Sequence, residues 1–263
     1  MKTNKELKRI ARERLFGHYK PAIGGMLLAE LIPTIILIPF SLILTTDSTM
    51  DSVIYLLASI AVSLLSVILA CGLNFLHLNI ARGRAVLVSD IFACFKNKPD
   101  AYILAYLFYI VKLLPCFIPL IPAICAVAFI SDFALSMILF FVFYVLVFVM
   151  MIIQVLRYAF VFYLQVDDPH ARIRDTFHES KRLMKGHKKQ LFILAISFIG
   201  WMLLSLLSLG IAFLWVAPYI NQTSAAFYLA AKEEPAESYS GYETNSDYET
   251  NSGYYTNSNH ENY

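Results

Sequence analysis

The chain has 263 residues, of which 59% are hydrophobic and only 15% are charged, and its formal net charge is +2. Soluble globular proteins carry about 25% charged residues, so this composition argues against an ordinary soluble domain. The apolar residues gather in long runs, which indicates a membrane protein, and the small net charge gives no reason to expect a nucleic-acid partner.

Residues 1–20 predict a basic amphipathic helix. Leu7, Ile10, Ala11 and Leu15 recur at helical spacing, and basic side chains occupy the remaining faces. Such a helix is expected to lie on the inner leaflet of the membrane, although a solvated tail beside the first span is the simpler alternative. The basic side chains expected to contact the inner leaflet here are Lys5, Lys8, Arg9 and Arg12.

Apolar runs long enough to cross a bilayer follow this helix, since about 20 helical residues span the hydrocarbon core. Three prolines interrupt the third run, so that segment could be kinked, split or re-entrant. The first four predicted spans are 21–45, 53–78, 100–130 and 134–160.

A second interfacial helix is predicted over residues 169–185. Asp167, Asp168 and Pro169 resemble a helix start, and the positions that follow place apolar residues on one face. The basic residues on its other faces, which are further candidates for inner-leaflet contact, are Arg172, Arg174, Lys181, Arg182 and Lys185.

Residues 190–231 carry no charge and can hold two more spans, 190–208 and 210–231, with a hairpin near Gly210. A break at Pro218 is the alternative, and it would leave one long span. Residues 232–263 contain a six-residue repeat rich in tyrosine and polar residues. They lack aliphatic side chains, so a disordered tail is predicted.

Basic residues cluster before the first span and in the segments that follow the second and fourth spans, while the turns after the first and third spans have none. Because Lys and Arg are enriched in cytoplasmic loops, the N-terminus is predicted to lie in the cytoplasm. Six spans would return the C-terminal tail to the same side. The predicted fold is therefore an all-α polytopic membrane helix bundle with about six transmembrane helices and two cytoplasmic interfacial amphipathic helices.

Polar groups are costly inside a membrane span, and four of those in the predicted spans merit attention as a candidate intramembrane site. Glu30 and Lys112 are expected at similar depths and could form an ion pair. The same groups could instead hold helices together, or Lys112 could extend to the interface. The candidate site consists of Glu30, Lys112, Asn221 and Gln222.

The familiar motifs for catalysis, nucleotide binding and metal binding are missing from the sequence. No catalytic, cofactor-binding or metal-ligating residue is therefore expected. We expect the lipid bilayer, including anionic lipid, as the partner, and the sequence indicates no protein partner.

Residues 163–232 resemble a family of bacterial integral membrane proteins catalogued as domain of unknown function nine-seven-five. The resemblance rests on LMKGHK (183–188), LFILAISFIGW (191–201), Pro218-Tyr219 and AAFYLA (225–230), and the stretch 6–23 is similar to the family's opening. The middle of the chain, roughly 100–150, departs from the pattern. The resemblance implies a bacterial cytoplasmic-membrane protein, and it implies no activity or site residue.

The leading hypothesis is a non-enzymatic protein with an organising or regulatory role at the inner leaflet. A transporter or permease for a small molecule or lipid is the alternative, and an intramembrane enzyme is a weaker one.

Overall fold

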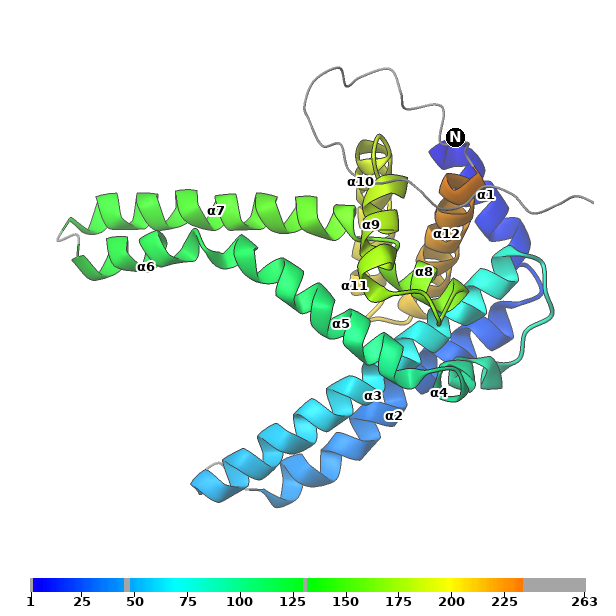
Figure 1. Ribbon diagram of the computed structural model, residues 1–263, viewed down its shortest axis with the longest axis horizontal. Coiled ribbons are helices and arrows are strands. Elements are labelled where there is room, and N and C mark those ends of the chain that lie inside the picture. The colour runs from blue at the N-terminus through cyan, green and yellow to red at the C-terminus, as the bar shows by residue number, and fades with distance from the viewer. Residues whose placement is uncertain (1, 45–47, 130–131, 234–263) are drawn as a thin grey trace, which may run out of the picture.

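The computed structural model describes residues 2–44, 48–129 and 132–233, and these residues form helices with no strand (Figure 1). The predicted tail, 232–263, therefore lies outside the described residues from 234 onward. The elements are α1 (Asn4–Leu15), α2 (Tyr19–Ile43), α3 (Thr49–Ala81), η1 (Val88–Phe92), α4 (Ala93–Lys96), α5 (Pro99–Leu113), η2 (Leu114–Phe117), α6 (Leu120–Phe129), α7 (Phe133–Arg157), α8 (Val161–Asp167), α9 (Ile173–Leu183), α10 (Lys188–Ile196), α11 (Ile199–Leu207) and α12 (Phe213–Glu233).

Five helical segments of the described chain are long and apolar enough to cross a membrane, which confirms the all-α polytopic fold. About six spans were predicted, and the sixth, 210–231, falls on α12, which is not among the five. The polar run from Asn221 to Ser224 lowers the hydropathy of α12. The five segments are Tyr19–Ile43, Thr49–Ala81, Pro99–Phe117, Phe133–Asp167 and Lys188–Leu207.

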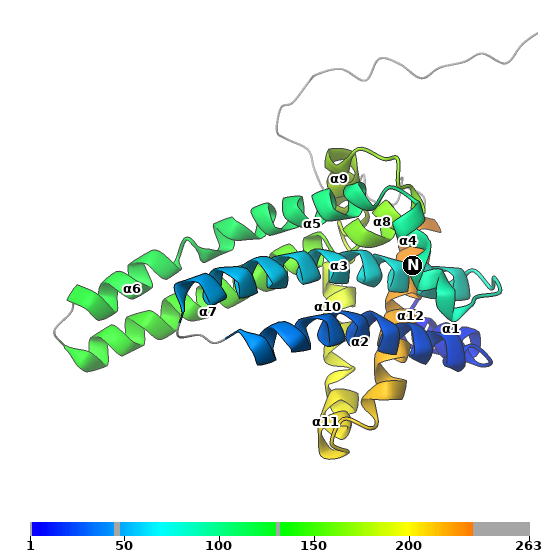
Figure 2. The same cartoon turned by 90° about the horizontal axis from the view of Figure 1, so that it is seen from below.

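The apolar helices form three hairpins that extend in different directions from one base (Figures 1 and 2). The first pairs α2 with α3, the second pairs α6 with α7, and the third joins α11 to α12. Leu209 and Gly210 both have positive φ in the turn of the third hairpin, which is where the sequence placed it. The predicted span 100–130 is divided into α5, η2 and α6, because proline cannot supply the backbone N–H that a continuous helix needs.

The base is built from α1, α8, α9, α12 and the C-terminal half of α3. A capping box between Thr3 and Glu6 begins α1, and hydrogen bonds from Thr3 lower the pKa of the Glu6 carboxyl. Leu7, Ala11 and Leu15 of α1 are fully buried, and α1 packs on α12 and α3. The apolar face that the sequence assigned to the membrane surface therefore packs against protein.

The second predicted interfacial helix, α9, also packs its apolar face against protein. It begins at Ile173, later than the predicted start at Pro169, with Arg172 as its N-cap residue. Phe177 is buried, and its ring packs against those of Phe108 and Tyr158 at centroid distances of 5.0 and 5.2 Å. Both amphipathic helices thus belong to the base, because neighbouring helices offer their apolar faces a better fit than solvent does.

Candidate functional site

Glu30 lies in a groove between α2 and α3 with a volume of about 440 Å³. The groove wall combines apolar side chains with hydroxyls that bond to their own helix backbones, as Thr34 does to the Glu30 carbonyl at 2.8 Å. Its polar lining consists of Glu30, Thr34, Ser59, Ser63 and Ser66. This arrangement places one carboxylate in a mainly apolar groove open to its surroundings.

The structure does not bring Lys112 to Glu30. The Lys112 ammonium on α5 lies 5.3 Å from the centre of the Phe108 ring, one turn earlier on the same helix. No ion pair joins the two charges within the described residues. The four predicted intramembrane residues therefore do not form one site.

Gln222 instead joins a buried polar pair that sequence reasoning missed. Its side-chain amide lies 3.0 Å from Nδ1 of His77, and both side chains are fully buried between α12 and α3. Among the residues that the structure describes, Nε2 of His77 has no hydrogen-bond partner. Asn221 contributes only its backbone carbonyl, which lies 3.5 Å from the Tyr163 hydroxyl. The sequence feature that could have revealed this pair is His77 itself, at the end of an otherwise apolar run, because a buried polar group needs a partner.

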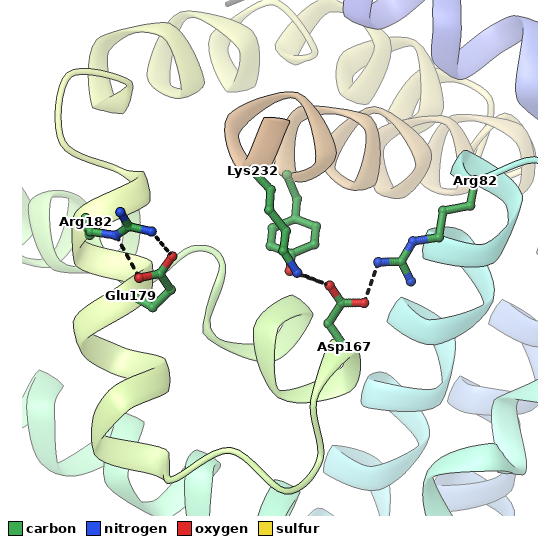
Figure 3. A network of polar contacts seen from close by, with 6 residues as sticks. Arg82, Asp167, Glu179, Arg182 and Lys232 are labelled. Atoms are coloured by element: carbon green, nitrogen blue, oxygen red, sulfur yellow. Dashed lines mark hydrogen bonds and ion pairs between the residues drawn. The ribbon is translucent and has the colours of Figure 1, made fainter. Parts of the chain in front are cut away.

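Asp167 is the centre of a second polar network, in the base. Its carboxylate accepts hydrogen bonds from Arg82, from the Lys232 ammonium at 2.5 Å and from the Tyr228 hydroxyl at 3.0 Å. Figure 3 shows Asp167 of α8 between Arg82 at the end of α3 and Lys232 of α12. The prediction of a helix start at Asp167 was therefore wrong, since the residue ends α8 and its carboxylate joins three helices.

Three donors from α12 and the end of α3 bind the Asp167 carboxylate, which suits it to hold these helices on α8. Burial raises the pKa of the Tyr228 phenol, and the negative charge of Asp167 acts in the same direction. Tyr228 therefore stays protonated as a donor. A pocket of about 340 Å³ adjoins Asp167, but within the described residues no group of His, Cys, Asp or Glu could hold a metal ion.

The predicted inner-leaflet contacts form an outward basic surface on α1 and α9. Lys8 differs from the rest, because its ammonium lies 4.3 Å from the centre of the Phe198 ring and bonds to the Ser197 carbonyl at 3.4 Å. Burial lowers the pKa of this ammonium. The exposed members are Lys5, Arg9, Arg12, Arg172, Arg174, Lys181, Arg182 and Lys185.

Comparison with known proteins gives one match. A family model described as "Protein of unknown function (DUF975)" covers residues 1–234. No curated protein and no solved structure matches the chain. The grounds for a function therefore lie in the chain's own residues.

Proposed function

We propose a function for this chain, which belongs to the DUF975 family. It is a non-enzymatic protein of the bacterial cytoplasmic membrane that organises anionic lipid at the inner leaflet. The observation that carries this proposal is the orientation of α1 and α9. Their apolar faces are buried in the base, while eight of the predicted basic contact residues, which lie on these helices or directly beside their ends, are exposed.

This arrangement favours electrostatic attraction over insertion. A lysine or arginine near an anionic surface contributes about 1 kcal/mol of attraction, and the attraction falls off within a Debye length. Because the apolar faces of both helices contact protein, hydrophobic insertion of α1 or α9 adds nothing to it. The distribution of basic residues favours an N-terminus in the cytoplasm, which would place the basic surface at the inner leaflet.

The test uses the full chain reconstituted in vesicles that contain equal amounts of phosphatidylglycerol and phosphatidylcholine. Electron spin resonance of spin-labelled lipids measures the fraction of each lipid immobilised by the protein. We expect several-fold enrichment of phosphatidylglycerol that disappears at high salt. Replacement of Lys5, Arg9, Arg12 and Arg174 by glutamine should remove most of it.

The matched control is Glu13→Gln, because Glu13 pairs with Arg9 at 3.8 Å on the exposed side of α1. Its removal raises the positive charge of the surface and should increase the enrichment. Equal immobilisation of both lipids by the wild-type chain at low salt would overturn the proposal.

Transport is the second candidate function, and the α2–α3 groove favours it. A lone carboxylate in an apolar groove would attract a cationic solute, so the matching probe is a lipophilic cation such as tetraphenylphosphonium. In proteoliposomes, Glu30→Gln should abolish protein-dependent movement of this cation, while Ser63→Ala should change it little. Movement that does not depend on the protein would exclude this function for that class of solute.

A further inference from the structure

A cluster of three basic residues lies where α7 ends, α9 ends and α10 begins. Arg157 is the last residue of α7, Lys181 is in the last turn of α9, and Lys188 is the first residue of α10. Helix α10 packs on α7, and the charges of Arg157 and Lys181 both act on the Lys188 ammonium. Arg157 and Lys188 are partly buried, whereas Lys181 is exposed.

Ser180, the residue before Lys181, joins α9 to the end of α7. This serine is fully buried, and its hydroxyl donates to the Arg157 carbonyl and accepts from the Phe160 N–H, both at 3.3 Å. Gly186 then reverses the chain with φ of +85°, and α10 packs against α7. The fold therefore brings Lys188, at the start of α10, back toward the ends of α7 and α9, which carry Arg157 and Lys181.

Within the described residues, the three basic groups have no acidic partner of the kind that neutralises some other basic residues. Arg82 and Lys232 share Asp167, and Arg182 binds Glu179 at 2.6 Å. Within residues 2–44, 48–129 and 132–233, no ion pair neutralises the three clustered charges.

Arg157 also has an unsatisfied donor. Within the described residues, its Nε is buried without an acceptor, and Oε1 of Gln154, one turn earlier on α7, is buried without a donor. Buried donors without partners are rare, and an unpaired charge that is partly removed from water is costly. An anion bound by the cluster would supply both the missing acceptor and the missing charge.

The start of α10 has the same polarity. The side chain of the N-cap residue, His187, makes no capping hydrogen bond, and the first backbone N–H bonded back into this turn is that of Leu191, to the His187 carbonyl. The preceding amides therefore add positive potential to that of Lys188.

We propose that Arg157, Lys181 and Lys188 form a binding site for a phosphate group. The guanidinium presents paired donors that match phosphate oxygens, and the two lysines add charge around them. The group can come from an anionic lipid headgroup or from a soluble phosphate compound. The lipid source deepens the proposed function, because it adds one specific site to a diffuse attraction, whereas the soluble source does not depend on it.

The experiment uses the full-length protein in nanodiscs of phosphatidylcholine. One arm titrates inorganic phosphate by calorimetry, and the other titrates short-chain phosphatidylglycerol. We expect saturable binding to one site in at least one arm, and the arm that binds identifies the source. Arg157→Gln and Lys188→Gln should each weaken this binding at least about tenfold.

Lys96→Gln is the matched control, because it removes one exposed positive charge at the end of α4, outside both the cluster and the basic surface of α1 and α9. It should change affinity less than about twofold, consistent with a distant exposed charge. Arg157→Lys keeps the charge but lacks the paired donors, so it should restore binding only in part. Lys188→Gln carries the test if Arg157→Gln lowers the yield of folded protein.

Equal weakening by Lys96→Gln and Lys188→Gln would overturn the site and leave only diffuse attraction. The absence of saturable binding in both arms would overturn it as well. If binding at the cluster persists while the spin-label experiment shows no enrichment of anionic lipid, the proposed function fails and the phosphate site stands.

Discussion

Helix α3 passes through two environments, and the contrast between them describes the whole molecule. In its N-terminal half, within the first hairpin, Leu57 is 62% exposed, whereas Leu76 in the base is fully buried. The hairpins carry apolar side chains outward, and the base encloses both apolar and polar side chains. Packing within the chain therefore specifies the base, whereas lipid must cover the outward faces of the hairpins.

The difference also separates the possible functions. A site in the base has fixed partners, as Asp167 does, and is suited to holding helices in place. A site on a hairpin, such as the groove around Glu30, faces what surrounds the protein. The following substitutions test the contrast between base and hairpins.

The largest effect is expected at Gly72, where α3 meets η1. A Cβ atom at this position would lie 1.8 Å from the carbonyl oxygen of Ile91, and backbone atoms cannot move aside cheaply. Gly72→Ala should therefore cost roughly 4 kcal/mol or more and prevent assembly of the base. Gly200→Ala, in a hairpin helix with nothing within 4 Å, is the control. Size-exclusion profiles in detergent should show aggregation for the first variant only.

The next effect compares two leucines of the same helix. Leu76→Ala removes a fully buried side chain and should lower the free energy of unfolding by about 3 kcal/mol. Leu57→Ala removes a side chain that faces outward from the hairpin and should change it by less than about 0.5 kcal/mol. Thermal unfolding in detergent measures both. Similar losses would mean that the hairpin is packed against protein as tightly as the base.

The sequence predicted the helical membrane fold because long apolar runs depend only on local composition. It also placed the turn at Gly210, where the residue type itself allows the positive φ. It did not predict that α1 would pack on α12, because an amphipathic face fits lipid and protein equally well until the tertiary contacts are known.

The polar contacts were less predictable for the same reason. Depth along a span suggested that Glu30 and Lys112 could meet, but depth says nothing about which direction a hairpin takes from the base. Gln222 was identified as a polar residue of interest, yet its partner His77 is 145 positions away in the chain. Only the packing of α12 on α3 brings that pair together.

A smaller effect is expected at Asp167. Its carboxylate is 11% exposed, and removal of its charge leaves Arg82 without its partner. Asp167→Asn should cost about 2–3 kcal/mol, less than a fully buried pair, because Lys232 is half exposed and can be solvated. Glu179→Gln breaks the exposed pair with Arg182 and should cost less than about 1 kcal/mol. Equal losses in thermal unfolding would show that Asp167 holds the base no better than a surface pair does.

The smallest effect is expected at Tyr228, whose hydroxyl donates to Asp167 at 3.0 Å while its ring stacks on Tyr163. Tyr228→Phe keeps the ring and removes one hydrogen bond to a charged group, so it should cost about 1.5 kcal/mol.

The pH dependence of this loss follows from the raised pKa of Tyr228 in the folded chain. Below the pKa of the unfolded chain, both the folded and the unfolded chains keep the phenolic proton, so the loss should be constant from about pH 6 to about pH 9. Above that range the unfolded wild-type chain releases the phenolic proton and the folded chain keeps it. The wild type alone then loses stability, and its difference from Tyr228→Phe in the free energy of unfolding narrows.

The control is Tyr219→Phe, because the Tyr219 hydroxyl lies 3.5 Å from the Lys8 carbonyl and its removal should have little effect. If Tyr228→Phe were as stable as the wild type, the network around Asp167 would depend on its two basic partners alone, and Lys232 would be the residue that joins α12 to α8.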